Sequence, residues 1–217
     1  MEDLVKIPLG FAVIAVALIM VPGMGMAQMG CPDLELSTVI QEVWGESALL
    51  VLPDGSGPPL TDAYRSDRTL IDATIFLNLY SSCPPTGPMA GYPAEDMWLE
   101  STVGNLVFCP GGSIADGPTD GEGSTWWSGA LSGGGWDSGS MIIRLATGDT
   151  PGLQLLPLLV NSPDLNGDLT VNLQDVALFA EDFFSAPYEL RSDLHFDRVI
   201  NLSDLSVMTG KVGKTCP

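Results

Sequence analysis

One twelve-residue pattern occurs twice near the C-terminal end of this 217-residue sequence. The first copy runs from Asp164 to Asp175, and the second runs from Asp193 to Asp204, twenty-nine residues later. The copies share the same residue at positions 1, 2, 5, 9, 10 and 12, so an internal duplication is the simplest explanation. Each copy spaces its side-chain oxygens as a short loop around a hard cation does, which constrains both the fold and the chemistry.

Such a loop binds calcium through side chains at positions 1, 3, 5, 9 and 12 and a backbone carbonyl at position 7. The candidate ligands are Asp164, Asn166, Asp168, Thr170, Asn172 and Asp175 in the first copy, and Asp193, Asp197, Val199, Asn201 and Asp204 in the second. Position 3 of the second copy is His195, and a neutral imidazole is a poor calcium ligand. We predict a Ca²⁺ site in the first copy and weak, water-mediated or no binding in the second. Acidic turns that bind nothing are the alternative.

A helix is predicted after each copy, because apolar residues recur there with the spacing of one helix face. Asn172 and Asn201 are placed to cap these helices, each with an aspartate three residues later, as in a capping box. The apolar faces consist of Val176, Phe179, Ala180 and Phe183 after the first copy, and of Leu205, Met208 and Val212 after the second.

Two loop–helix units with no helix before the first loop resemble a type I dockerin, over about residues 162–213. The resemblance implies a small α module with two EF-hand-type loops that binds calcium and docks onto cohesin domains. Position 6, usually glycine in this family, holds Leu169 and Arg198, and a left-handed backbone would cost such residues ~1–2 kcal/mol. Positions 10 and 11, where cohesin reads small hydroxyl residues, hold Leu173-Gln174 and Leu202-Ser203. A cohesin-like protein, another protein, or the chain's own β domain is the expected partner.

The region before the repeat, from about Leu34 to Val160, is predicted to form short strands. Between Ile71 and Tyr80, aliphatic residues at every second position alternate with other residues, the period of a half-buried strand. Further strands are predicted at 48–52, 97–99, 106–108, 125–128, 141–145 and 153–160, separated by turns rich in glycine and proline. About seven strands without a long helix predict a β-sandwich.

Part of this region resembles a bacterial Ig-like domain of the invasin/intimin type. The resemblance is carried by Ile71–Leu79, the turn up to Pro88, Tyr92–Leu99 and Thr119–Trp126. Such domains act as spacers or adhesive modules, so the resemblance implies no catalysis. The expected fold is therefore mainly β: an Ig-like β-sandwich over residues 28–161, followed by a small α dockerin-like module over residues 162–217.

The N-terminal residues predict export. The chain is apolar from Ile7 to Met20, and Gly25 and Ala27 are small residues at the −3 and −1 positions of a signal-peptidase site. We predict a signal peptide over residues 1–27, cleaved after Ala27, and a secreted or cell-surface bacterial protein. An uncleaved membrane anchor and a lipid anchor at Cys31 are the alternatives. No span is expected in the mature chain, because the apolar run is shorter than the ~20 residues that a membrane helix needs.

Export makes disulfides the expected state of the four cysteines, Cys31, Cys83, Cys109 and Cys216. Three connectivities are possible. We predict a bridge between Cys83 and Cys109, because both lie in the predicted sandwich. Cys31 and Cys216 pair only if the domains fold back on each other, and otherwise stay free or bond to another molecule. A metal–thiolate site is disfavoured because no two cysteines have C-x-x-C spacing.

Charge and motif content narrow the function. The formal net charge of −19 excludes nucleic acid and anionic membrane surfaces as main partners, because such a polyanion gains nothing from releasing phosphate counterions. The only histidine, His195, has no residue at motif spacing that would orient it as a catalytic base. Glu95-Asp96 and Glu100 lie in one extended segment, where neighbouring side chains point to opposite faces, and do not form a glycosidase pair.

Two function classes remain. The first is a secreted, non-catalytic protein whose calcium-stabilised module docks onto a partner or onto its own sandwich. The second is a carbohydrate-active protein of the cellulosome type that binds or degrades glycans. Trp126-Trp127 and Trp136 could stack on sugars in the second class, although strand alternation sends one of the adjacent pair into the core.

Overall fold

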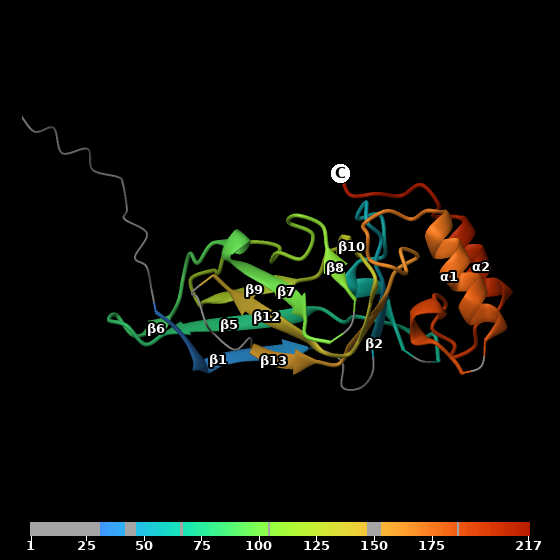
Figure 1. The fold of residues 1–217 in the computed structure, drawn as a ribbon. Coiled ribbons are helices and arrows are strands. Elements are labelled where there is room, and N and C mark those ends of the chain that lie inside the picture. The colour runs from blue at the N-terminus through green and yellow to red at the C-terminus, as the bar shows by residue number, and fades with distance from the viewer. Residues whose placement is uncertain (1–30, 42–46, 66, 104, 147–152, 186) are drawn as a thin grey trace, which may run out of the picture.

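The computed structural model describes residues 31–41, 47–65, 67–103, 105–146, 153–185 and 187–217. Within these ranges the protein is mainly β, with strands β1 to β14 followed by two α-helices (Figure 1). The predicted signal peptide, residues 1–27, lies outside the described residues. No helix of the described ranges is long and apolar enough to cross a membrane.

The strands form four hydrogen-bonded sheets in the described part of the chain. In the first, β5 (Ile75–Ser81) pairs with β1 (Pro32–Gln41), β6 (Gly87–Pro88) and β9 (Ser124–Trp127). The second has the order β13 (Leu153–Leu156), β12 (Met141–Leu145), β7 (Met97–Ser101). The third has the order β11 (Trp136–Ser138), β14 (Leu158–Asn161), β2 (Ser47–Leu50), β3 (Ala63–Tyr64), β4 (Leu70–Ile71), with β14 and β2 parallel. The fourth pairs β8 (Val107–Phe108) with β10 (Gly133–Gly134).

The main core lies between these sheets and follows the predicted alternation. On β5, Ile75, Leu77 and Leu79 are fully buried while the residues between them are half-buried. Trp127 is buried as well, and its indole Nε1 donates to the Ser113 carbonyl at 2.9 Å. Burial of each such large side chain stabilises the fold by about 1.5–3 kcal/mol. Other fully buried members of this core are Leu49, Leu60, Met97, Leu99, Met141 and Ile143.

Two of the predicted strands are interrupted in the structure. The segment 71–80 breaks between β4 and β5, where Asp72 Oδ1 accepts hydrogen bonds from the backbone N–H and the hydroxyl of Thr74. This local turn occupies the Thr74 N–H, which would otherwise pair with a neighbouring strand. The segment 153–160 breaks at Pro157, which has no N–H to donate, and its halves β13 and β14 belong to different sheets.

The two predicted helices are present as α1 (Leu173–Phe184) and α2 (Leu202–Thr209), which lie side by side at one end of the molecule (Figure 1). Each begins with the predicted asparagine cap and a complete capping box. Phe179 and Met208 are buried in a second, smaller core, joined by Leu165, Val171 and Leu194 from the loops. Val212 lies beyond the end of α2 and Ala180 is exposed, so these two residues are not part of the buried helix faces. Short 3₁₀ helices occur at Leu60–Asp62 (η1), Ala94–Asp96 (η2) and Leu190–Ser192 (η3).

The predicted Cys83–Cys109 bridge is wrong. The disulfides join Cys31 to Cys83 and Cys109 to Cys216, and none of these cysteines is free. Cys31 reaches Cys83 because β1 pairs with β5 and places Pro32 opposite Ser81. Cys109 follows β8, next to the C-terminal tail, so the second bridge links the strand-rich region to the helical module.

Candidate metal centre

The two repeated loops have the same backbone conformation. In both, positions 4 and 6 adopt positive φ: Gly167 and Leu169 in the first loop have φ of 71° and 67°, and Phe196 and Arg198 in the second have 56° and 65°. Position 6 lacks the glycine that is usual in the dockerin pattern, yet Leu169 and Arg198 both adopt the left-handed conformation there. Because Leu and Arg are strained there by ~1–2 kcal/mol each, contacts elsewhere in the loops must hold this shape.

The aspartate at position 1 supplies many of those contacts. The Asp164 carboxylate accepts hydrogen bonds from the backbone N–H groups of Gly167, Asp168 and Leu169 at 3.0, 3.2 and 2.7 Å. Asp193 does the same in the second loop, accepting from Asp197 at 3.2 Å and Arg198 at 2.8 Å. Both aspartates are buried, Asp164 at 0% and Asp193 at 1% exposure. Each therefore forms the centre around which its loop is wound.

The aspartate at position 12 closes each loop onto its helix. Asp175 accepts from the backbone N–H of Asn166 at 3.2 Å and of Asn172 at 2.8 Å. In the second loop, Asp204 accepts from the corresponding residues, His195 and Asn201, at 2.8 Å each. Positions 3, 9 and 12 are thus tied together, and the first turn of the helix is part of the loop.

Side chains at positions 3, 5 and 9 converge in both loops. In the first, the Nδ2 groups of Asn166 and Asn172 lie 3.1 and 3.4 Å from Asp168 Oδ2. In the second, Asp197 Oδ2 lies 3.2 Å from His195 Nδ1 and 3.5 Å from Asn201 Nδ2. The carbonyl at position 7 faces the same group, since Asn172 Nδ2 donates to the Thr170 carbonyl at 3.0 Å and Asn201 Nδ2 to the Val199 carbonyl at 3.2 Å. The structure thus brings the predicted ligand residues together within each loop.

In the first loop, the carboxylates of Asp164 and Asp175 are buried, whereas that of Asp168 is exposed. Burial raises the pKa of Asp164 to about 6, opposed by the hydrogen bond from Leu169 and reinforced by the negative charges of Asp175 and Asp168. Burial likewise raises the pKa of Asp204 in the second loop. At Asp197, burial acts in the same direction, but hydrogen bonds from His195 and Val199 outweigh it and the net pKa is lowered. A divalent cation would offset both the cost of burying the Asp164 carboxylate and the repulsion from its neighbours.

The donor set of the first loop fits calcium by its chemistry. It offers three carboxylates, two side-chain amides and one backbone carbonyl, all oxygen donors of the kind that Ca²⁺ takes. The second loop replaces one amide with the His195 imidazole and fits less well. No three acidic, histidine or cysteine side chains form a ready metal cluster among the described residues, so in both loops the amides and the carbonyl must complete the ligand set.

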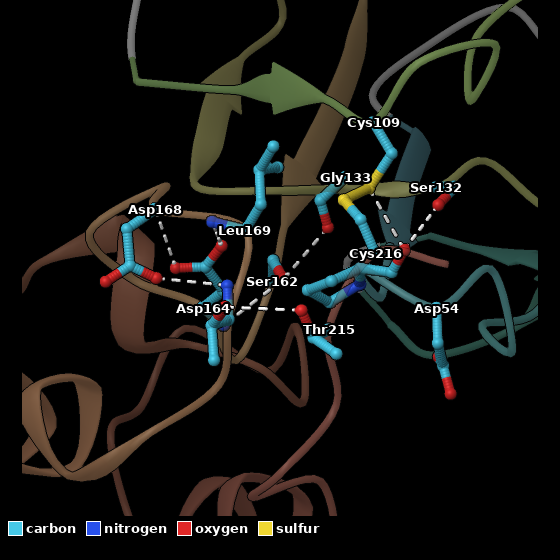
Figure 2. The surroundings of a disulfide bond; sticks show 12 residues. Asp54, Cys109, Ser132, Gly133, Ser162, Asp164, Asp168, Leu169, Thr215 and Cys216 are labelled. Atoms are coloured by element: carbon cyan, nitrogen blue, oxygen red, sulfur yellow. Dashed lines mark hydrogen bonds between the residues drawn. A yellow bond between two sulfur atoms is a disulfide. The ribbon is translucent and has the colours of Figure 1, made fainter.

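The strand-rich region presses against the first loop through β10 (Figure 2). Gly135 N–H donates to the Asp164 carbonyl at 2.6 Å, and the Ser162 hydroxyl lies between the Gly133 carbonyl and Asp164 N–H, at 3.4 and 3.2 Å. A Cβ atom on Gly134 would overlap the Asp164 carboxylate. The sequence marked the Gly133–Gly135 run only as a turn, because nothing in its composition indicates what packs against it.

The second loop also rests on the strand-rich region. The Asn161 side chain at the end of β14 donates to the carbonyls of Leu190 and Asp193 at 2.6 and 2.8 Å. Arg68 donates to the His195 carbonyl at 3.2 Å, and the Tyr64 and Phe196 rings stack with centroids 6.4 Å apart. Both repeated loops therefore face the strand-rich region, and the helices lie on the outer side.

The other candidate residues are dispersed, except that Glu95 and Glu100 line the same groove on the β domain. Glu95 is exposed on η2, and Glu100 pairs with Arg144 at 3.1 Å. Trp127 is buried, as alternation predicted, while Trp126 is exposed on β9. Trp136 lies on β11 in a different sheet, with its indole nitrogen buried, so the tryptophans do not share a sugar-stacking face.

Comparison with known proteins adds no relative to these observations. No family model, no curated protein and no solved structure matches the chain. Interpretation of the loops therefore rests on their own geometry and chemistry.

Proposed function

We propose that this protein is a secreted, non-catalytic protein whose C-terminal residues 162–217 form a dockerin-like, calcium-stabilised docking module. The module is carried on an Ig-like β domain that acts as a spacer. The observation that carries the proposal is the repeated loop. Two segments of related sequence adopt the same left-handed turns, and in both the side chains at positions 5 and 9 lie next to each other. Loops of this shape without a cation would hold buried carboxylates together at a cost in free energy.

A docking surface is provided by the outer side of the module. Leu173 and Leu202 occupy position 10 of the two loops and the first residue of each helix, and they are 77% and 70% exposed. Exposed apolar side chains that gather on one surface can mark a protein–protein interaction site, and the two leucines occupy equivalent positions of the duplicated unit. Because the loops face the β domain, these leucines remain accessible to a cohesin-like protein in the assembled chain.

Calcium titration calorimetry on the mature full-length protein tests the metal half of this proposal. We expect calcium uptake below millimolar concentration, lost in large part in an Asp164→Ala/Asp168→Ala variant. A Glu95→Ala/Glu122→Ala variant removes the same two charges from exposed β-domain positions and controls for net charge. No uptake by the parent protein at millimolar calcium, or equal uptake by both variants, would contradict the proposal.

The docking half is tested with a panel of purified cohesin domains and the full-length protein. We expect binding that requires calcium and that is lost in a Leu173→Lys/Leu202→Lys variant. The matched control is a Leu36→Lys/Ile40→Lys variant, which replaces two exposed aliphatic residues of β1, more than a hundred residues before the module. Equal binding by the two double variants would place the docking surface elsewhere.

A second candidate function, glycan binding, is supported by one groove on the β domain. The groove has a volume of about 400 Å³, and its lining includes Trp98, Phe108, Glu95 and Glu100. An indole beside carboxylates provides both a stacking face and hydrogen-bond acceptors for sugar hydroxyls. Specific signals on a glycan array that disappear in Trp98→Ala, but persist in Trp126→Ala, would favour this function over docking alone.

A further inference from the structure

Loop one, defined as residues 164–175, is held from two sides by parts of the chain outside the repeated unit. On one side lies the β8–β10 pair, whose Gly134 leaves room for the Asp164 carboxylate. A Cβ on Gly167 would come within 2.7 Å of the Asn105 carbonyl, so loop one and the β domain are in close backbone contact at a second point. Any side chain larger than hydrogen at Gly134 would displace the first ligand position.

The C-terminal tail, residues 211–217, holds the other side. Gly213 N–H donates to the Val171 carbonyl and Val171 N–H donates to the Lys214 carbonyl, both at 2.8 Å. Cys216 N–H donates to the Leu169 carbonyl at 3.3 Å, and Thr170 and Thr215 form an antiparallel bridge. The tail therefore pairs with loop positions 6 to 8, which include the strained Leu169 and the carbonyl ligand of Thr170.

One covalent bond connects these two sides. The Cys109–Cys216 disulfide joins the tail to the residue that follows β8 (Figure 2). Cys109 N–H in turn donates to the carbonyl of Ser132, one residue before β10, at 3.0 Å. Lys214 Nζ and Asp54 Oδ2, 2.6 Å apart, add an ion pair between the tail and the β domain. Loop two has no disulfide against it, so this arrangement distinguishes the two loops.

We propose that the Cys109–Cys216 disulfide and Gly134 are positioning elements for the first cation loop: they hold loop one in its ligand-binding shape, and calcium affinity at loop one depends on both. The inference rests on the calcium binding proposed above. A loop held in the competent shape only a tenth of the time has a Kd about tenfold higher, so loss of the tether appears directly in affinity.

The test uses the full-length protein with loop two silenced by Asp193→Ala/Asp197→Ala, and calorimetric titration with calcium chloride. A Cys109→Ser/Cys216→Ser variant is compared with a Cys31→Ser/Cys83→Ser variant, which removes the other disulfide, far from the loops. We expect the calcium Kd to rise about tenfold or more in the first and to stay within about twofold in the second. A Kd within twofold of the parent in both variants would overturn the inference.

A glycine pair provides an independent measurement if the cysteine variant does not fold. Gly134→Ala is compared with Gly121→Ala, where the added methyl group meets nothing within 4 Å. We expect weaker calcium binding only in Gly134→Ala, and equal affinities would overturn the inference. Repeating both comparisons with loop two intact and loop one silenced by Asp164→Ala/Asp168→Ala should leave the loop-two affinity unchanged. If the parent protein takes up no calcium, the proposed function itself is overturned. If it does, but its Kd is unchanged by these substitutions, only the positioning role of the Cys109–Cys216 disulfide and Gly134 is overturned.

Discussion

Arg191 donates two hydrogen bonds of 2.7 Å to the carboxylate of Asp182 and thereby ties the segment before the second loop to the last turn of α1. Asp182 is buried, and Ser192 also donates to it, at 2.6 Å. A carboxylate near a helix C-terminus is unfavourable by itself, so these donors keep it in place. The pair connects the two copies of the repeat by side chains that lie in neither loop.

Asp182→Ala should therefore destabilise the protein by about 2 kcal/mol, because it leaves the guanidinium of Arg191 without its carboxylate. The figure is below that of a fully buried pair because the Arg191 side chain keeps 27% exposure to water. Urea unfolding monitored by circular dichroism measures the change. Glu181→Ala, at the neighbouring exposed position, is the control and should shift the free energy of unfolding by less than about 0.5 kcal/mol.

The same pair predicts a pH dependence. Burial acts to raise the pKa of Asp182, but the hydrogen bonds from Arg191 and Ser192 outweigh it, and the net pKa lies below its usual value. A group with a lowered folded pKa stabilises the fold above its unfolded pKa, and this contribution is lost as the pH falls through the folded value. Below about pH 4 the wild-type protein should lose stability more steeply than Asp182→Asn. Parallel stability curves for the two proteins would contradict this assignment.

Lys214→Met should raise the pKa of Asp54. The hydrogen bond from Lys214 is the main reason that the pKa of Asp54 lies at about 2. Without it, the carboxyl group should titrate nearer its ordinary value, as followed by the carboxyl carbon shift in an NMR titration. Both side chains are partly exposed, so the loss of stability should stay under about 1 kcal/mol. Lys211→Met, three residues earlier, should leave the Asp54 titration unchanged.

Arg198→Gly should stabilise the calcium-free protein by about 1 kcal/mol, because it relieves a left-handed conformation at φ of 65°. Arg198 is exposed, so the side-chain interactions lost with it are worth under about 1 kcal/mol and offset only part of the relieved strain. Thermal unfolding in the presence of a chelator measures the effect. Ser206→Gly, at an exposed position inside α2, controls for the flexibility that glycine adds to the unfolded chain and should destabilise by about 0.5 kcal/mol.

His195→Asp should strengthen calcium binding by the second loop. The substitution replaces an imidazole, now 3.2 Å from Asp197, with a carboxylate at position 3. We expect roughly a tenfold lower Kd in titrations with loop one silenced, and lower stability without calcium, since the added charge repels Asp197. His195→Gln keeps the position neutral and should change affinity less. An unchanged Kd in His195→Asp would mean that position 3 does not face the cation.

Local sequence predicted the elements that local interactions create. The alternation on β5 and the asparagine caps at Asn172 and Asn201 depend on residues a few positions apart, and both are present. β1 was not predicted as a separate strand because it exposes Leu36 and Ile40, so its hydrophobic pattern does not mark a buried face.

What sequence could not predict depends on contacts between distant segments. The cysteine pairing follows from the β1–β5 register and from the path of the tail, neither of which is encoded near a cysteine. The close contact of Gly134 with Asp164 joins residues thirty positions apart, and a glycine run carries no signal for its neighbour. The convergence of loop residues within each copy was predicted because the duplication repeats their spacing, but the burial of Asp164 and Asp193 against the β domain was not.

The position of β14 determines how a pulling force would pass through the molecule. This strand lies between β11 and β2 in its sheet, and its last residue, Asn161, is only three residues from Asp164. Tension applied through the helices would therefore reach a strand that is hydrogen-bonded to two neighbours, and not an edge strand. The Cys109–Cys216 bond adds a second covalent path to the β domain. A protein held by a partner at its helical end would thus resist mechanical separation of its two parts.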